Sequence, residues 1–231
     1  MMRPSDAPVL VVTGLLAEAR IAAGHGVAVV CRGNQQELLR DIVRRRTDGR
    51  FCAVVSFGVA GGLDPDLAPG RITLARQITR GGERLAADAA LTARVHSQLL
   101  SAIPDVRVAD IAAVDEPQCT PAEKQALRSS TGADAADMES WEAALLAAEL
   151  GVGFAAVRAV CDPAYRRVPA AALAGLGADG GTNAWSVARS LLGTPSELPD
   201  LVHCAAGWAR ALRALRRART TLGAGFGLAN L

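Results

Sequence analysis

Two carboxylates stand where an α/β protein could use them for chemistry. Asp162 follows Val157–Cys161, which has the composition of a strand, and Pro163 stiffens the backbone beside it. Glu139 lies in the sequence DMES at residues 137–140, where a helix is expected to begin. An ordinary turn would also explain Asp162, and helix capping by Asp137 would explain one acid of the second group. Because a helix needs only one cap, Glu139 and the following Glu142 supply more acid than capping requires, and Asp162 stands where α/β folds place a catalytic carboxyl.

A glycine-rich run follows the expected strand Phe51–Phe57 and consists of Gly58, Val59, Ala60, Gly61 and Gly62. Its three glycines would let the backbone turn sharply and approach a ligand without an obstructing Cβ atom. The run is not GxGxxG, and no GK[ST] follows it, so neither a dinucleotide site nor a Walker-type phosphate site is indicated. A plain tight turn and a binding loop explain the run equally well.

Short apolar runs alternate with helical patterns along the chain. Strands are expected at Val9–Thr13, Val27–Cys31, Phe51–Phe57, Arg71–Ala75, Val106–Ala113 and Gly153–Val160. Helices are expected at Leu15–Ala23, Gln35–Arg46, Asp88–Ile103, Pro121–Ser130, Met138–Leu150, Asn183–Leu192 and Pro199–Arg219. The alternation predicts a single α/β domain over residues 1–231 with a three-layer α/β/α fold. Ligands of such folds bind beyond the carboxyl ends of the strands, where the glycine-rich run and Asp162 are expected.

These three motifs, in this order, resemble the superfamily of purine nucleoside phosphorylases and methylthioadenosine nucleosidases. Its members share a G-x-A-G-G-L motif, an [ED]-M-E helix start and an R-x-x-[SC]-D strand end, and the resemblance spans about Val9 to Leu192. The stretches GLLAEARIAA, SFGVAGGLDPDLAPG and FAAVRAVCDPA also resemble the hopanoid-associated phosphorylases, a branch thought to remove adenine from adenosylhopane. The resemblance implies a central mixed sheet and cleavage of the N-glycosidic bond of a 5′-substituted adenosine.

The resemblance also implies a role for each motif residue. Glu139 would accept hydrogen bonds from the ribose 2′- and 3′-hydroxyls, with Met138 packed against the sugar. Asp162 would protonate or hydrogen-bond N7 of the purine. The run Gly58–Gly62 would bring backbone groups beside the base and the anomeric carbon. Glu18, in GLLAEAR, falls near the place where nucleosidases keep a water-activating glutamate.

The chemistry of the bond agrees with these roles. Breaking it develops positive charge on the sugar and negative charge on the departing base, so an acid at the base accelerates the reaction by roughly 10²–10⁴-fold. Asp162 can protonate the base only if it already carries a proton or receives one from another group. A carboxylate near the sugar stabilises the positive charge that develops there. Arg158 lies four residues before Asp162 and is expected on the same strand face, where it would tune that carboxyl or, as we favour, pair with another acid.

Two departures from the phosphorylase pattern concern the nucleophile. Phosphorylases of this superfamily bind phosphate through an arginine two residues before the first glycine of the run and a hydroxyl residue just after it. This chain has Ser56 and Val59 there, and serine does not replace the charge and bidentate fork of arginine. We therefore expect hydrolysis, with phosphorolysis as the alternative. Arg20 and Arg80 are the candidates for a different phosphate site.

Composition excludes several other classes of protein. The five cysteines are scattered, none forms a CxxC pair, and the three histidines give no ligand spacing with them, so neither a disulfide framework nor a zinc site is expected. A net charge of +2 does not indicate nucleic-acid binding. The sequence shows no membrane-spanning run and no signal peptide, which predicts a cytoplasmic protein. We expect no metal and no organic cofactor.

The C-terminal segment 199–231 is expected to form a basic amphipathic helix and a tail. Its apolar stripe is expected at Leu201, Ala205, Trp208, Leu212 and Leu215, with Arg210, Arg213, Arg216, Arg217 and Arg219 beside or opposite it. The helix could dock on the domain with a solvated basic face, or it could contact an anionic membrane surface near a lipid-like substrate. The glycine-rich stretch Gly223–Leu231 is expected to be loosely ordered.

Two further classes compete with a nucleoside-cleaving enzyme. A non-catalytic nucleoside-binding module would keep the glycine-rich run but would not need both Glu139 and Asp162. A Rossmann-type oxidoreductase is disfavoured because no phosphate fingerprint follows the first strand. The superfamily also implies a homo-oligomer, most simply a dimer, that binds a small purine nucleoside.

Overall fold

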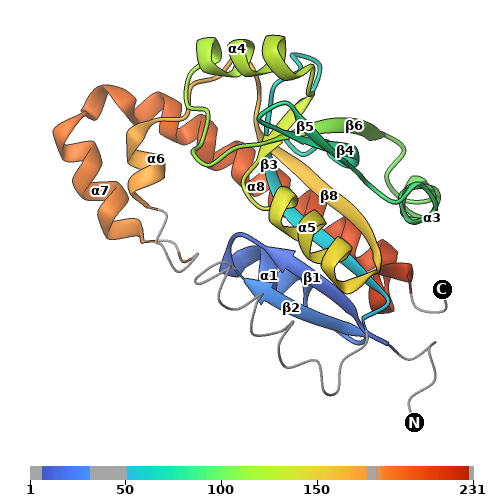
Figure 1. Ribbon diagram of the computed structural model, residues 1–231. Coiled ribbons are helices and arrows are strands. Elements are labelled where there is room, and N and C mark those ends of the chain that lie inside the picture. The colour runs from blue at the N-terminus through green and yellow to red at the C-terminus, as the bar shows by residue number, and fades with distance from the viewer. Residues whose placement is uncertain (1–6, 32–50, 176–180, 182, 229–231) are drawn as a thin grey trace.

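The computed structural model describes residues 7–31, 51–175, 181 and 183–228 (Figure 1). The strands are β1 (Val9–Thr13), β2 (Val27–Cys31), β3 (Ala53–Gly62), β4 (Ile72–Arg80), β5 (Glu83–Ala86), β6 (Val106–Ala113), β7 (Ala135–Asp137) and β8 (Gly153–Asp162). The α-helices are α1 (Leu16–Ala22), α3 (Ala89–Leu100), α4 (Pro121–Thr131), α5 (Ser140–Leu150), α6 (Ala170–Ala174), α7 (Ala184–Gly193) and α8 (Leu198–Leu222), with 3₁₀ turns η2 (Pro195–Glu197) and η3 (Ala224–Gly227). The helix predicted at Gln35–Arg46 lies outside the described residues.

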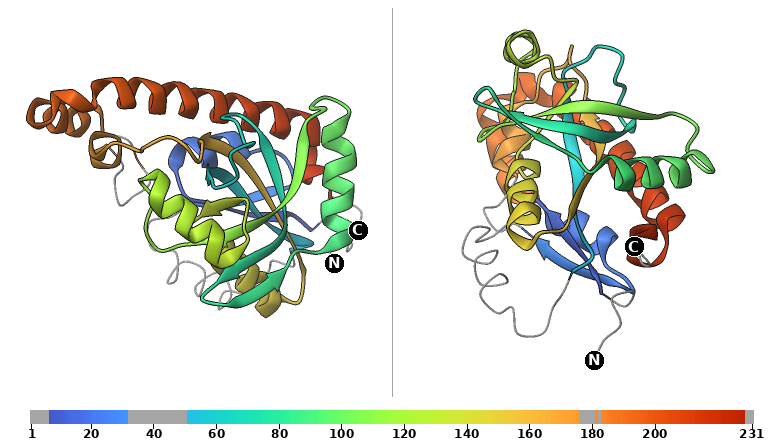
Figure 2. Two further views of the ribbon diagram at one scale, coloured as in Figure 1. Left: turned by 90° about the horizontal axis from the view of Figure 1, so that it is seen from above. Right: turned by 45° about the vertical axis from the view of Figure 1, so that its right-hand side comes forward.

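The described strands form one mixed sheet in the order β2-β1-β3-β7-β6-β4-β5, with β8 paired to both β3 and β4. The pairs β1–β2, β1–β3, β3–β8, β4–β6 and β6–β7 are parallel, and β3–β7, β4–β8 and β4–β5 are antiparallel. Because β3 pairs with β8 at one side and β7 at the other, strands β3, β8, β4, β6 and β7 close into a ring. Figure 2 shows β1 and β2 (blue) extending from one side of this ring.

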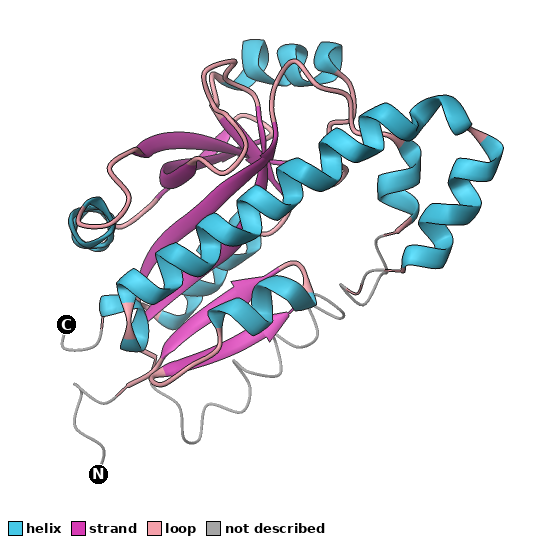
Figure 3. Ribbon diagram, turned by 180° about the vertical axis from the view of Figure 1, so that it is seen from behind, coloured by secondary structure: helices cyan, strands magenta, loops and turns pink. Residues whose placement is uncertain are grey.

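Helices cover the sheet on both faces, so its strands are buried on both sides. Val9 and Val11 of β1 belong to a core with helices α1, α3 and α8, whereas Leu10 and Val12 belong to a second core with α5. Figure 3, which views the molecule from behind, shows α8 crossing in front of the strands with α1 beside it. The alternation of side chains along a strand explains why a run such as VLVVT is apolar throughout.

The glycine-rich run is part of a strand, whereas the sequence left a tight turn and a binding loop equally open. β3 continues from Ala53 through Gly62, because β8 pairs with it as far as Gly61 and β7 pairs with Gly61 and Gly62. The register of β8 on β3 shifts by one residue after Ala60. This irregularity breaks the simple alternation from which Arg158 and Asp162 were predicted to share a strand face.

The helix predicted from Met138 begins two residues later, at Ser140. Residues Ala135–Asp137 form β7, whose backbone pairs with β6 and β3, so the chain is still extended as it reaches Met138. Met138 and Glu139 therefore lie at the junction between a strand end and a helix start. The short strands β5 and β7 had no clear signal in the sequence.

Helix α8 docks on the sheet through a stripe of buried residues that shares only Leu215 with the predicted one. Its buried residues are Gly207, Ala211, Leu215, Ala218 and Leu222, whereas Ala205 is exposed. Small residues allow close packing on β8: a Cβ atom at Gly207 would collide with the carbonyl oxygen of Cys161. The predicted stripe followed the large side chains, but close approach to the strand selects the face with Gly207 and Ala211.

The glycine-rich segment after α8 is packed as far as Leu228, contrary to the expected loose tail. Phe226 is fully buried, and its ring meets the ring of Phe57 edge to face with centroids 5.2 Å apart. The guanidinium of Arg219 lies 5.0 Å from the centroid of the Phe226 ring. Within the described residues, no helix is both long and apolar enough to span a membrane.

Candidate active site

Arg158 of β8 is the centre of a buried charge cluster beside the middle of β3 and the end of β7. Its side chain is fully buried, and Nε lies 2.5 Å from Oδ2 of Asp137, which is equally buried. Nη1 lies 3.6 Å from Oε2 of Glu139. A buried guanidinium is tolerated only where acids and hydrogen bonds compensate its charge. The favoured expectation that Arg158 pairs with another acid is thus confirmed, and Asp137 is a site residue whose role the sequence had suggested only as a cap.

Two serines complete the surroundings of Arg158. Its Nη2 donates to Ser56 Oγ at 2.5 Å and to Ser140 Oγ at 3.1 Å. The backbone N–H of Ser140 donates to Asp137 Oδ1 at 3.1 Å, and the Ser140 hydroxyl donates to Asp137 Oδ2. The first residue of α5, the end of β7 and the buried guanidinium are therefore fixed to one another, which positions Glu139 between them.

Glu18 of α1 points into the same region and is 2% exposed. Its Oε2 accepts backbone hydrogen bonds from Gly14 at 3.0 Å and Leu15 at 2.9 Å, and its Oε1 accepts one from Val59 at 2.8 Å. Burial raises the pKa of the Glu18 carboxyl above its ordinary value, and the positive charge of Arg158 and the three N–H donors oppose this only in part. A carboxylate with a raised pKa is a stronger base near neutral pH than an ordinary one.

Two glycines are required by the close approach of these groups. A Cβ atom at Gly58 would lie 2.6 Å from Arg158 Nη1 and 2.7 Å from Glu18 Oε1. A Cβ atom at Gly14 would lie 2.5 Å from Glu139 Oε1. Gly14, directly after β1, and Gly58, within β3, thus leave room for carboxylates where any side chain would exclude them.

Asp162 lies further along the sheet, at the end of β8 and beside Gly61. A Cβ atom built on Gly61 would lie 3.3 Å from Asp162 Oδ2. Gly58 and Gly61 are three residues apart on β3, which separates their Cα atoms by about 10 Å. Glu18 and Glu139 therefore lie together at one position along β3, and Asp162 lies about 10 Å further along the strand.

Lys124 is a site residue that the sequence reasoning did not identify. It lies in the first turn of α4, is 1% exposed, and its Nζ lies 2.5 Å from Oδ2 of Asp162. The thiol of Cys161 donates to the other oxygen, Oδ1, at 2.8 Å. The available signal was composition: Lys124 is the only lysine among the 25 lysine and arginine residues.

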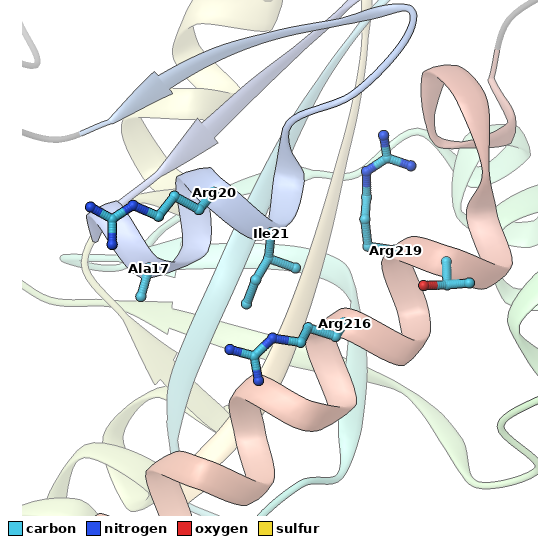
Figure 4. Close-up of a pocket in the computed structure, with 6 residues that line it drawn as sticks. Ala17, Arg20, Ile21, Arg216 and Arg219 are labelled. Atoms are coloured by element: carbon cyan, nitrogen blue, oxygen red, sulfur yellow. The ribbon is translucent and has the colours of Figure 1, made fainter.

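The two arginines considered for a phosphate site point elsewhere. Arg80 binds Glu142 at 3.0 Å and Asp115 at 2.6 Å. Arg20 lines a surface pocket between α1 and α8 together with Ala17, Ile21, Arg216, Arg219 and Thr220 (Figure 4). Arg20 is exposed whereas Glu18 is buried, so they lie on different sides of α1. In the part of the chain that the structure describes, no group of three or more His, Cys, Asp and Glu residues is arranged to hold a metal ion.

A mixed sheet with buried carboxylates converging at its strand ends is the frame of an enzyme. The model of the Phosphorylase superfamily matches residues 10–174, which is more than half of the chain. The chain therefore belongs to the Phosphorylase superfamily, and the predicted enzyme class of nucleosidase or nucleoside phosphorylase is confirmed at the level of this family. None of the curated proteins matches the sequence.

Solved structures of similar fold agree with this assignment. Futalosine hydrolase of Helicobacter pylori is 14% identical, with a TM-score of 0.63 and coverage of 94% of this chain and 95% of that chain. S-adenosylhomocysteine nucleosidase from Streptococcus pyogenes, solved with 5-methylthiotubericidin, is 14% identical, with a TM-score of 0.62 and coverage of 92% and 95%. The 5′-methylthioadenosine/S-adenosylhomocysteine nucleosidase of Campylobacter jejuni is 17% identical, with a TM-score of 0.58 and coverage of 90% and 98%. The predicted fold class is thereby confirmed.

Proposed function

We propose that this protein hydrolyses the N-glycosidic bond of a purine nucleoside and releases the free base. The observation that carries the proposal is the separation of the carboxylates into two groups. Glu18 and Glu139 gather around Arg158, and Asp162 lies about three residues of strand further along. One group suits a sugar that becomes positively charged, and the other suits a base that leaves with the bond's electrons.

The reaction assigns one task to each carboxylate. The C1′–N9 bond breaks with its electron pair moving to the base, and Asp162 delivers a proton to N7 so that the base leaves neutral. A water oxygen attacks C1′ and gives its proton to Glu18. Glu139 accepts hydrogen bonds from the ribose hydroxyls and, with Met138 beside it, fixes the orientation of the sugar. The backbone of Gly58, Val59, Ala60 and Gly61 lines the strand along which the substrate lies.

We favour water as the nucleophile because the groups at the expected phosphate position already have hydrogen-bond partners in the protein. Ser56 is buried and accepts a hydrogen bond from Arg158, and the N–H of Val59 donates to Glu18. A phosphate dianion placed there would meet the Glu18 carboxylate, and the nearby guanidinium of Arg158 is already paired with Asp137 and Glu139. The charge of the phosphate would therefore be poorly compensated, which is costly in a buried site. The same carboxylate is suited to polarising a water molecule.

The finer identity of the substrate rests on the resemblance to hopanoid-associated proteins. We propose a 5′-substituted adenosine, adenosylhopane in hopanoid biosynthesis, as the substrate and adenine as the product. The neighbouring nucleosidases bear names of 5′-substituted adenosines, which agrees with this class of substrate. A cytoplasmic homodimer that touches the membrane surface through α8 would fit a lipid-like substrate.

Release of free base tests the proposal. Purified protein is incubated with adenosine, 5′-methylthioadenosine and adenosylhopane, and adenine is followed by chromatography. We expect adenine from at least one of the 5′-substituted compounds, without addition of metal or cofactor. Absence of base from every nucleoside tested would refute the proposal. Activity that a chelator abolishes and a divalent ion restores would contradict the cofactor-free reaction.

A further inference from the structure

The contacts of Lys124 satisfy all three of its N–H bonds. Nζ donates to Asp162 Oδ2 at 2.5 Å and to the carbonyl oxygens of Pro163 and Arg166, both at 3.0 Å. Three acceptors around one amine are the surroundings of an ammonium ion. Asp162 in turn receives a second hydrogen bond from Cys161. Both oxygens of Asp162 thus accept hydrogen bonds from donors of the protein, and the donor on Oδ2 is in line to pass a proton through this carboxyl group.

The position of this lysine is unfavourable unless it has a special task. A buried ammonium loses its hydration, and a cation in the first turn of a helix opposes the helix dipole. Of the 25 lysine and arginine residues, Lys124 is the one lysine and the other 24 are arginines. Arginine retains its proton at all ordinary pH values, whereas lysine can give one up when it is buried. The chain thus has its single lysine, whose ammonium group can lose a proton, in contact with the carboxyl group of Asp162.

We propose that Lys124 is a positioning residue that supplies, through Asp162, the proton taken by the departing base. This inference rests on the proposed function and names the source of its proton. As the C1′–N9 bond breaks, a proton passes from Nζ to Oδ2 and from Asp162 to N7, which leaves a neutral amine at Lys124. After the base departs, the amine takes a proton from solvent. The ammonium holds Asp162 in place before the step and stabilises its charge.

Other titratable groups around the pair do not replace this proton source. Three thiols face it: Cys161 from β8, Cys119 from the segment before α4, and Cys204 from α8. Burial raises the pKa of each thiol, with the nearby Asp162 charge adding to the effect, so they stay neutral. The charged side chains of Glu123 and Arg167 also act on Cys119 beside the pair, and Glu123 is held by the start of α4.

A pH profile separates proton supply from mere support of the turn after β8. An ordinary ammonium keeps its proton to a pH about six units higher than an ordinary carboxylic acid does. In Lys124→Met the proton must sit on Asp162 itself, so we expect the alkaline limb of kcat/KM to move to lower pH by at least one unit. Each unit costs tenfold in activity above the limb. The matched control is Arg128→Met, which removes a cation from the same helix that binds Asp64 instead.

The single lysine also permits a measurement that does not depend on turnover. Protein labelled with ¹⁵N-lysine gives one side-chain amine signal, and adenine serves as the probe. We expect adenine to shift this signal in the wild type and to leave it unmoved in Asp162→Asn. Circular dichroism and thermal melts establish that each variant is folded, and Lys124→Gln replaces Lys124→Met if the latter does not fold.

The outcomes distinguish the two proposals. An active wild type with an unmoved pH profile in folded Lys124→Met overturns the role of Lys124 and leaves the proposed function intact. A wild type that cleaves no nucleoside overturns the proposed function. In that case a lysine signal that shifts with adenine still supports the link between Lys124 and the base. A signal that does not shift in adenine-saturated protein overturns this link, and so does failure of the protein to bind adenine.

Discussion

The backbone N–H of Val59 donates a hydrogen bond to Glu18 Oε1 over 2.8 Å. This contact joins the middle of β3 to the start of α1 across 41 residues of sequence. Val59 stands at the position where the phosphorylases that the sequence resembles have a phosphate-binding hydroxyl. In this protein the N–H of that residue binds a carboxylate instead. The two residues come from separate sequence motifs, the glycine-rich run and GLLAEAR, and their contact bears on which nucleophile the proposed reaction uses.

The products should therefore be those of hydrolysis. With a cleaved nucleoside in hand, we expect a free reducing sugar and a rate that does not depend on added phosphate. A reducing-sugar assay and phosphorus-31 NMR of the reaction mixture measure both. A sugar 1-phosphate that forms only when phosphate is present would show that phosphate is the nucleophile.

Replacing Glu18 by glutamine should lower kcat by at least about 10²-fold, because the amide cannot take a proton from water. The change should also alter stability in a pH-dependent way. Burial raises the pKa of Glu18 above 4.5, so the folded state binds this proton more tightly than the unfolded state does. Wild-type stability is then lost as the pH rises above that value, whereas glutamine does not titrate. Thermal melts from acidic to neutral pH should show Glu18→Gln gaining Tm relative to wild type.

Sequence patterns predicted most of the described elements because long apolar runs and amphipathic repeats dominate their burial. All six predicted strands are present. The errors occur where tertiary pairing overrides local signals. Glycine is conformationally permissive, so Gly58–Gly62 suggested a turn, but pairing with β8 and β7 holds the run extended. The three-residue strand β7 is too short to carry a pattern of its own.

Only part of the site was predicted from the sequence, because its contacts also depend on tertiary structure. Motifs place Glu139 and Asp162 at element ends, but they do not show which charged groups those residues contact. The ion pair between Lys124 and Asp162 joins residues 38 positions apart, one in the first turn of α4 and the other at the end of β8. Arg158 was recognised as a pairing residue, whereas its partner Asp137 was assigned to a helix cap.

Adding one methyl group at Gly58 should inactivate the enzyme. The new Cβ atom would meet Arg158 Nη1 and Glu18 Oε1 at 2.6 and 2.7 Å, so one of the two buried groups must move. We expect Gly58→Ala to lower kcat/KM by at least about 10²-fold, the cost of misplacing a reacting group by roughly 1 Å. Gly193→Ala is the matched control, because a Cβ atom there meets nothing within 4 Å. Steady-state kinetics of both variants provide the comparison, and wild-type activity in Gly58→Ala would contradict the packing argument.

The exposed face of α8 should bind vesicles that contain anionic lipid. Leu198 and Val202 are 53% and 59% exposed, and Arg213 follows Val202 by 11 residues, which places it on the same helix face. Truncating α8 would remove Leu215 from the core, so charge reversal of the surface is the safer test. We expect Arg213→Glu/Arg216→Glu to pellet less with phosphatidylserine vesicles than wild type does. Arg84→Glu/Arg189→Glu changes the net charge equally, and equal pelleting of the two double variants would argue against a role for α8.

The two ends of the site should respond differently to substitution. Asp162→Asn keeps the shape of the side chain but removes its charge, and we expect kcat to fall by at least about 10²-fold with little change in KM. Glu139→Ala removes contacts to the sugar in both the ground state and the transition state, so kcat and KM should both be impaired.

Asp162→Ala should in addition lower the free energy of unfolding by on the order of 3 kcal/mol, because it leaves the Lys124 ammonium buried without its carboxylate. The double variant Asp162→Ala/Lys124→Met should recover stability but not activity, as measured by chemical denaturation and steady-state kinetics. Near-normal turnover in Asp162→Asn would remove Asp162 from the acid role, and unchanged stability in Asp162→Ala would mean that the ion pair contributes nothing to the fold.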